Sequence, residues 1–252
     1  MVTALLAGAL TFVFTTMLTI AGEGAAIILI PTFIALGIDI RVAMATALLL
    51  NSIAMVFACP RYAKNNLIMY KVALPILIVA AIFSPLGVHV SRLLDRTLLL
   101  WLFVGFLLFA SSMMFFYRPK EKHQKEAERS KTKQIGYGIL VGAFAGFMAG
   151  LLGVGGGNFI LPVLVYLGFN PKKASATTAF IVIFSSFAGF LGHASIGNIS
   201  IPLLVFTTLG SIFGALMGSW LMTEKLKPKQ VKLIIGIVLL GIALKMIWNL
   251  IV

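Results

Sequence analysis

The sequence predicts an all-α polytopic membrane protein made of two inverted repeats, each with about five helical segments. Two observations lead to this prediction. The chain is too apolar to form a soluble globule, and its two halves match each other when one is slid along the other. The distribution of basic residues among the loops then indicates how the two repeats are oriented in the membrane.

The composition excludes most classes of soluble protein. Of 252 residues, 60% are hydrophobic and 11% are charged, whereas a soluble domain carries about 25% charged residues. So few charges cannot cover a globule with a solvated surface, which rules out a soluble enzyme, a secreted domain and a nucleic-acid-binding module. The net charge of +13 lies mostly in short loops between apolar runs, as in membrane proteins, so we expect no nucleic-acid partner.

The sequence gives no indication of a metal or a cofactor. Cys59 is the only cysteine, so an internal disulfide is impossible and a thiolate metal cluster is not expected. The apolar segments contain no HxxxH-like motif and no pair of acidic residues of the kind that suits a membrane-embedded enzyme. We therefore expect no cofactor, no metal site and no catalytic residues.

Ten apolar segments cover the chain, and most of them reach the roughly 20 residues that a helix needs to cross a ~30 Å hydrocarbon core. Two segments hold only about a dozen residues, or roughly 18–20 Å of helix. Each short segment follows a Gly-rich turn and carries a proline, Pro31 or Pro162. In order, the predicted segments are 2–21, 25–36 (short), 42–60, 70–91, 97–117, 135–152, 156–168 (short), 174–191, 200–221 and 231–250.

The two halves of the chain are copies of each other. Sliding the sequence by 131 positions, without a gap, superposes glycines and prolines that mark backbone geometry. An Ala-x-Ala-Thr stretch at 43–46 then falls on another at 174–177. Internal duplication of this kind is typical of secondary transporters. The matched pairs are Gly22 with Gly153, Gly24 with Gly155, Pro31 with Pro162, Gly37 with Gly168, Gly87 with Gly218, and Gly105 with Gly236.

The basic residues predict that the repeats are inverted. A basic linker at 118–134 separates a first repeat at 1–117 from a second at 135–252. With this linker in the cytoplasm and every segment counted, 16 basic residues fall inside and three outside. If the short segments are left out of the count, ten fall inside and nine outside. The positive-inside rule favours the first topology, which places both termini outside.

The loop charges leave one question about the short segments open. Segments 2–21 and 25–36, like 135–152 and 156–168, could each cross fully or form a re-entrant hairpin, because both arrangements give the same loop sides. As hairpins they would bring the two Gly-rich turns toward the membrane midplane from opposite faces. Inverted-repeat transporters place their substrate there.

The Gly-rich turn that opens the short segment of the second repeat suits the binding of an anion. Glycines let the backbone approach a ligand closely, and the unpaired N–H groups of a helix N-terminus carry about half a positive charge. Such a turn binds an anion without a basic side chain, which would be costly in lipid. The alternative is close helix packing through small residues. The candidate substrate-binding residues of the two turns are Gly22, Gly24, Gly153, Gly155, Gly156, Gly157 and the neutral amide donor Asn158.

Glu23, in the first turn, is the only one of the seven acidic residues that lies well inside an apolar region. A carboxylate there is expensive unless it is paired, protonated or functional, so we hypothesise that Glu23 is a proton-coupling residue. Alternatively, Glu23 lies at the mouth of a wet cavity or caps the following helix. Thr46, Thr177 and Asn51 are further candidates for substrate binding, although threonine also bonds to the backbone of its own helix.

Residues 153–180, with the sequence GVGGGNFILPVLVYLGFNPKKASATTAF, resemble the TauE/SafE family of membrane transporters, also called the sulfite exporter or TSUP family. The weaker first copy at 22–52, GEGAAIILIPTFIALGIDIRVAMATALLLNS, resembles the same pattern. The resemblance covers nearly the whole chain. In the first copy, Glu23 and the Ala25-Ala26 pair depart from the fuller glycine cluster, so equal roles for the two turns are not expected.

The resemblance implies an integral, multi-pass permease of a prokaryotic inner membrane for small sulfur-containing anions such as sulfite, thiosulfate or organosulfonates. The residues themselves indicate a secondary transporter with an anion site built from helix dipoles, working by alternating access around the Gly-rich turns. An anion channel is the main alternative, and a membrane-embedded enzyme is a weaker one. The expected partners are a small anionic substrate and membrane lipid, and the sequence leaves a homo-oligomer open.

Overall fold

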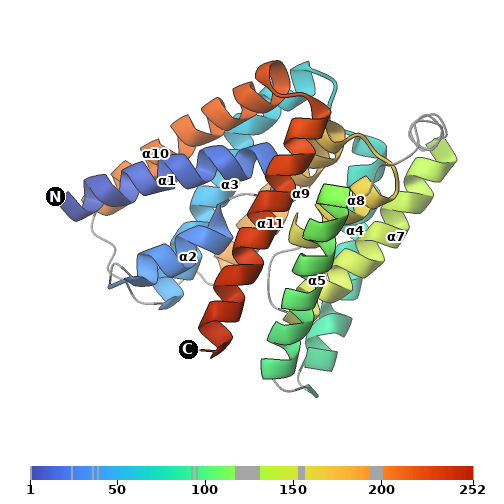
Figure 1. Ribbon diagram of the computed structural model, residues 1–252, viewed down its shortest axis with the longest axis horizontal. Helices are drawn as coiled ribbons and strands as arrows, with labels where there is room; N and C mark the ends of the chain where they lie inside the picture. The colour runs from blue at the N-terminus through green and yellow to red at the C-terminus, as the bar shows by residue number, and fades with distance from the viewer. Residues whose placement is uncertain are drawn as a thin grey trace.

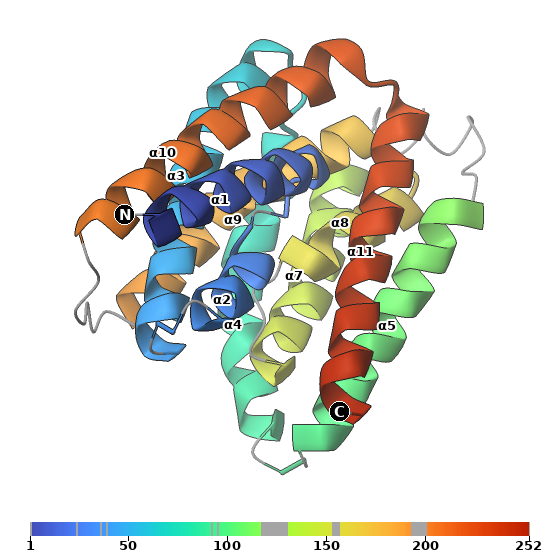
Figure 2. The same cartoon turned by 60° about the vertical axis from the view of Figure 1, so that its left-hand side comes forward.

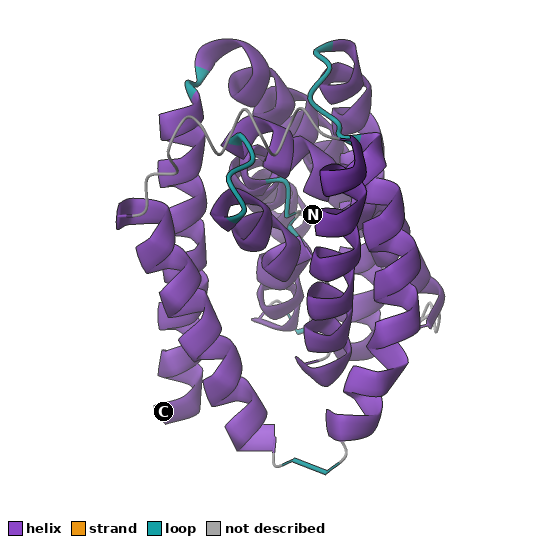
Figure 3. Cartoon of the chain, turned by 90° about the vertical axis from the view of Figure 1, so that its right-hand side faces the viewer, coloured by secondary structure: helices purple, strands orange, loops and turns teal. Residues whose placement is uncertain are grey.

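The computed structural model describes residues 2–23, 25–35, 37–38, 40–91, 93–94, 96–116, 131–152, 157–192 and 201–251. Within these residues the chain forms ten α-helices, one π-helical turn and no strand, so the all-helical prediction is confirmed. The helices are α1 (Val2–Ala21), α2 (Ala26–Ala35), α3 (Ile40–Lys64), α4 (Tyr70–Ser91), α5 (Arg96–Phe116), α7 (Lys131–Leu152), α8 (Gly157–Tyr166), α9 (Pro171–Gly192), α10 (Ile201–Trp220) and α11 (Pro228–Ile251). Short loops join most of them (Figure 3).

The helices differ in whether they are long enough to cross a membrane. Five helices, α3, α4, α9, α10 and α11, contain apolar stretches of at least 18 residues, enough to cross a membrane. The two short helices α2 and α8 have ten residues each, which is about 15 Å of helix and half the thickness of a hydrocarbon core. Neither short helix can therefore cross by itself.

Most helix bounds lie within four residues of the predicted ones, and two of the differences have a physical reason. Helix α7 begins at Lys131, inside the stretch assigned to the linker, because lysine and glutamine favour helix and a long basic side chain can reach out of the apolar layer. Helix α10 continues into a π-helical turn at Leu221–Lys225, a backbone detail that hydropathy does not report.

The helices from the two halves of the chain pack against each other rather than forming separate bundles. The four most extensive interfaces each join one helix from each half: α1 with α10, α4 with α7, α3 with α9, and α5 with α11 (Figures 1 and 2). The shift of 131 residues matches α1 with α7 and α4 with α10, so the α1–α10 and α4–α7 interfaces are equivalent. It also matches α3 with α9 and α5 with α11, so each of these two interfaces joins a helix to its own counterpart. This equivalence supports a duplicated architecture, while the inversion of the repeats across a membrane stays a prediction.

Glycines bring the two most extensive interfaces into close contact. On α10, Gly218 packs so tightly that an added Cβ would lie 2.5 Å from the carbonyl oxygen of Thr16 on α1. On α4, the matched Gly87 packs in the same way on the carbonyl oxygen of Phe147, the residue of α7 that matches Thr16. Small residues that allow such backbone approach are the usual means of associating helices in membranes.

The contacts also give the relative directions of these helices. Along the α1–α10 interface, Gly8 contacts Gly210 and Thr16 contacts Gly218, so the two helices run parallel. Along the α3–α9 interface, Leu48 contacts Gly189 on α9, whereas Ser52 donates a hydrogen bond to Ile183, so these two helices run antiparallel.

The glycine contacts predict different effects on stability for a glycine-to-alanine substitution at two positions. Gly218→Ala places a methyl group against backbone and should lower the free energy of unfolding by about 1–3 kcal/mol. Gly105→Ala is the control, because nothing lies within 4 Å of an added Cβ there, and it should leave stability unchanged or raise it by up to about 1 kcal/mol. Thermal unfolding of the two purified variants measures the difference, and equal melting temperatures would contradict the packing.

Candidate functional site

The first Gly-rich turn lies where α1 ends inside the bundle. Gly22 has a φ of +72°, a backbone conformation that favours glycine. An added Cβ would also overlap the backbone carbonyl oxygen of Ser175 on α9, so both the conformation and the space require glycine at this position. The sequence therefore identified a turn that another residue could form only with strain.

Side chains from both repeats bond to the last carbonyl groups of α1. The Tyr62 hydroxyl on α3 donates to the carbonyl oxygen of Thr19 at 2.9 Å, and the Ser175 hydroxyl on α9 donates to that of Ile20 at 2.8 Å. Carbonyl groups at the end of a helix have no partner within the helix, and a buried helix end needs such bonds. Neither Tyr62 nor Ser175 was predicted from the sequence to have a role at the site.

The first turn contacts the start of the short helix of the second repeat. A Cβ added at Gly157, the first residue of α8, would lie 3.6 Å from the carbonyl oxygen of Glu23 and 3.7 Å from Cγ2 of Thr178 on α9. Asn158, the next residue of α8, is 6% exposed. Of the other predicted glycines, Gly24, Gly153, Gly155 and Gly156 lie outside the described residues.

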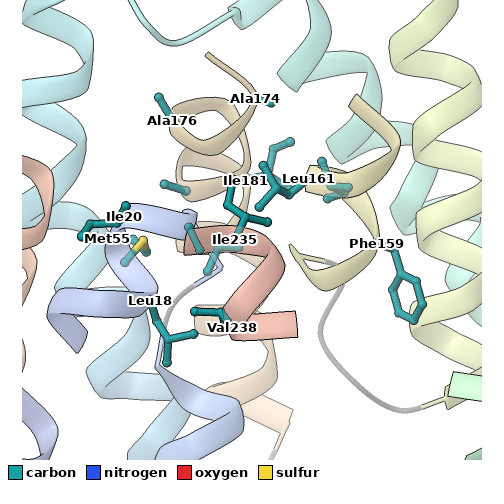
Figure 4. Close-up of a cluster of buried hydrophobic side chains, with 14 of the residues drawn as sticks. Leu18, Ile20, Met55, Phe159, Leu161, Ala174, Ala176, Ile181, Ile235 and Val238 are labelled. Atoms are coloured by element: carbon teal, nitrogen blue, oxygen red, sulfur yellow. The ribbon is translucent and has the colours of Figure 1, made fainter. Parts of the chain in front are cut away.

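An apolar shell surrounds this contact. Buried hydrophobic side chains from five helices of both halves belong to one cluster, part of which Figure 4 shows. They include Leu18 and Ile20 of α1, Met55 of α3, Leu161 of α8, Ile181 of α9 and Ile235 of α11. Water has little access to such a shell, so electrostatic interactions inside it are strengthened.

Glu23 brings a carboxyl group into this apolar region. Its side chain is 6% exposed, and within the described part of the chain neither of its two oxygens has a hydrogen-bond partner. Burying a polar group without a hydrogen bond is costly, and burying a charge without a partner costs far more. The carboxyl therefore requires a proton, a water molecule, a ligand or a partner outside the described residues, and the burial predicted for it from the sequence is confirmed.

Other buried polar groups without a partner lie on the helices around Glu23. Among the described residues, these are the hydroxyls of Thr15 and Thr19 on α1, Thr46 on α3 and Thr178 on α9, and the side-chain oxygen of Asn51 on α3. The Asn51 amide donates to the Ser186 hydroxyl on α9 at 2.8 Å. The facing helices α3 and α9 therefore carry polar groups between the two repeats, which is unusual in a core otherwise filled by apolar side chains.

The neighbouring threonines Thr177 and Thr178 have different surroundings. The Thr177 hydroxyl accepts a hydrogen bond at 3.0 Å from the backbone N–H of Met69, just before α4 begins, so it caps that helix. Thr178, which was not among the predicted site residues, lies beside Gly157 with its hydroxyl unpartnered among the described residues. Of the two threonines, Thr178 is therefore the one that lies at the start of α8, through its methyl group.

The described residues contain no group of three or more His, Cys, Asp and Glu side chains that could hold a metal ion. What the geometry offers is a helix N-terminus, a buried carboxyl and several hydroxyl and amide groups. These groups can bind and release a small polar solute in an apolar interior.

A bundle of helices with several long apolar spans is typical of an integral, multi-pass membrane protein. A family model described as Sulfite exporter TauE/SafE matches residues 6–246, so the chain belongs to the TauE/SafE family of membrane transporters. The family named from the sequence motifs is therefore confirmed.

Relatives of this chain occur in bacteria, archaea and plants. The Probable membrane transporter protein YunE of Bacillus subtilis is 27% identical over 253 residues, which cover 92% of each chain. A Probable membrane transporter protein of Methanocaldococcus jannaschii is 27% identical over 210 residues, 79% of this chain and 76% of its own. Sulfite exporter TauE/SafE family protein 1 of Arabidopsis thaliana is 27% identical over 97 residues, 35% of this chain and 22% of its own. No solved structure matches this chain.

The anchoring of α1 predicts a cost for removing one hydroxyl group. Tyr62→Phe removes one of the two donors to the buried carbonyl of Thr19, the other being the backbone N–H of Gly22, and should lower the free energy of unfolding by about 0.5–1.5 kcal/mol. Tyr70→Phe is the matched control, because Tyr70 is 48% exposed, and should change stability little. Thermal unfolding in detergent compares the two, and an unchanged melting temperature for Tyr62→Phe would contradict the anchoring role.

Proposed function

We propose that this protein is a secondary transporter that moves small sulfur-containing anions, such as sulfite, thiosulfate or organosulfonates, across a prokaryotic inner membrane. The observation that supports this most is the contact between the Glu23 turn and the N-terminus of α8 inside the bundle. The description of the family as a sulfite exporter supports a sulfur oxyanion as the substrate.

The N-terminus of α8 suits an anion because its backbone N–H groups and helix dipole attract negative charge. Asn158 adds a neutral amide donor, and Thr178 adds a hydroxyl that can donate as well as accept. Donors that are fixed in place bind an oxyanion without the cost of burying a basic side chain in lipid. A site of this kind can also release its anion, which a transporter requires.

A proton on Glu23 would make the carboxyl compatible with an anion in the same site. An ionised carboxylate beside a bound oxyanion would repel it, whereas a protonated carboxyl can donate a hydrogen bond to it. Anion binding and protonation of Glu23 then favour each other. We therefore assign Glu23 the proton-coupling role and expect proton and anion to move together.

The directions of the helices support the inverted topology. With the linker in the cytoplasm and both termini outside, α1 and α10 both run inward, whereas α3 and α9 run in opposite senses. These are the relations that the contacts between the helices have. Ser52 and Ile183 are equivalent positions of the two halves, because they are related by the shift of 131 residues. Their contact therefore lies near the pseudo-twofold axis that would relate the two repeats. Rocking one repeat against the other about α3 and α9 would open the site to alternate sides.

Stabilisation by anions tests the proposed site. At about 100 times its dissociation constant, a ligand should stabilise the folded protein by roughly 2.7 kcal/mol. We expect sulfite or thiosulfate, but not chloride or phosphate at matched ionic strength, to raise the melting temperature of the wild type and not of Asn158→Ala. Asn65→Ala, at the exposed end of α3, is the control and should respond like the wild type. No shift with any sulfur anion would contradict the site.

Transport by proteoliposomes tests the role of Glu23. Wild-type uptake of thiosulfate, whose charge is constant through the neutral range, should increase when a proton gradient is imposed in the direction of transport. Glu23→Gln should retain exchange of labelled for unlabelled thiosulfate but lose the response to the gradient. An unchanged response would exclude Glu23 from coupling, and electrodiffusive currents without saturation would indicate a channel.

A further inference from the structure

A groove opens on one side of the bundle between α1, α2 and α11. It has a volume of about 490 Å³, within the range of about 300–1,000 Å³ that is typical of ligand pockets. Phe14 and Leu18 of α1, Ile28 of α2 and Val238 of α11 form much of its lining. Figure 4 shows Leu18 and Val238 side by side there. Among the described residues that line the groove, none is one of the residues proposed to bind the anion.

The corresponding place in the other half of the molecule is filled by side chains. The shift of 131 residues places Phe159 where the groove has Ile28, and Phe106 where it has Ile237. Those two phenylalanine rings pack against each other with centroids 4.8 Å apart. The duplicated fold therefore closes one of its two equivalent spaces with aromatic side chains and leaves the other open.

The only charged residue among the described residues that line the groove is Lys245. The matched position in the filled half is Met114, which is 2% exposed. Near Lys245, Gly241 also borders the groove, and a Cβ added there would meet nothing within 4 Å. The groove thus has an apolar lining, a cation at Lys245 and free space beside Gly241.

We propose that this groove holds an acyl chain of an anionic phospholipid whose phosphate lies at Lys245. The groove opens on a surface that lipid contacts, because Met17, Ile237 and Leu244 beside it are 44%, 51% and 55% exposed. Trp248, one turn beyond Lys245, is 68% exposed and suits the level of the lipid headgroups. A cation at that depth and an apolar channel below it match the two ends of a phospholipid, because a lysine ammonium binds a phosphate group as a point charge.

The test is native mass spectrometry of the full-length protein with phosphatidylglycerol or with zwitterionic phosphatidylcholine. The wild type should bind one phosphatidylglycerol in preference to phosphatidylcholine. Lys245→Met should reduce this preference about fivefold, the equivalent of roughly 1 kcal/mol, which is the upper end of the range for an exposed ion pair. Lys229→Met, at the opposite end of the same helix, is the matched control and should keep it.

Filling the groove tests the acyl-chain part of the proposal. Gly241→Leu should abolish the binding of phosphatidylglycerol. Gly105→Leu, at another site where an added Cβ meets open space, should leave that binding unchanged. If Gly241→Leu is not monodisperse, Gly241→Ala replaces it and should reduce the binding. Unchanged lipid binding by the filled variant, or an equal loss in the Gly105 control, would overturn the proposal. Binding of inorganic phosphate that displaces no lipid would overturn the headgroup assignment.

Discussion

The structure depends on one constraint of the hydrocarbon core, which is that a backbone polar group without a partner is very costly there. Helices satisfy this constraint along their length but not at their ends. This chain ends α1 and begins α8 inside the bundle, where water is scarce. It does so because Tyr62 and Ser175 supply hydrogen bonds to the last carbonyl groups of α1. Such partners make it possible for α1 to end in the interior.

The same constraint makes the two repeats depend on each other. The donor from Ser175 and the contact at Gly157 come from the second repeat, whereas the Glu23 turn belongs to the first. Glycines along α10 and α7 let the helices of opposite halves approach to backbone contact, which helps to fix the end of α1 relative to the start of α8. A solute bound between the end of α1 and the start of α8 would therefore contact both halves, and a movement of one half against the other would change its access. Such geometry favours a transporter over a protein with a fixed binding pocket.

The sequence predicted the helical segments well because apolar runs, glycines and prolines act locally. The bounds of α1 and α4 match the prediction to the residue, and the glycine at position 22 has the positive φ that its turn suggested. The assignment of individual side chains was harder. Successive residues of a helix point about 100° apart, so which of Thr177 and Thr178 faces the turn depends on how α9 is rotated in the bundle. Hydropathy contains no information on that rotation.

The groove beside α11 was beyond prediction for a different reason. It exists because the paired positions 28 and 159 carry side chains of different size in the two halves, and only the packed structure shows that one fills its space while the other does not. The donors to the end of α1 were missed similarly, since Tyr62 is 43 residues from its acceptor and Ser175 is 155 residues from its own. Contacts between repeats at such separations leave no local signal.

The most direct test of the interior anion site is to locate the anion. Crystals grown with selenite, a heavier analogue of sulfite, would give an anomalous peak at each bound selenium atom. We predict one strong peak beside the first backbone N–H groups of α8, in contact with the turn at Glu23 and with Thr178. Peaks confined to basic residues at the helix ends, or an interior without selenium at saturating concentration, would contradict an anion site built from these helix termini.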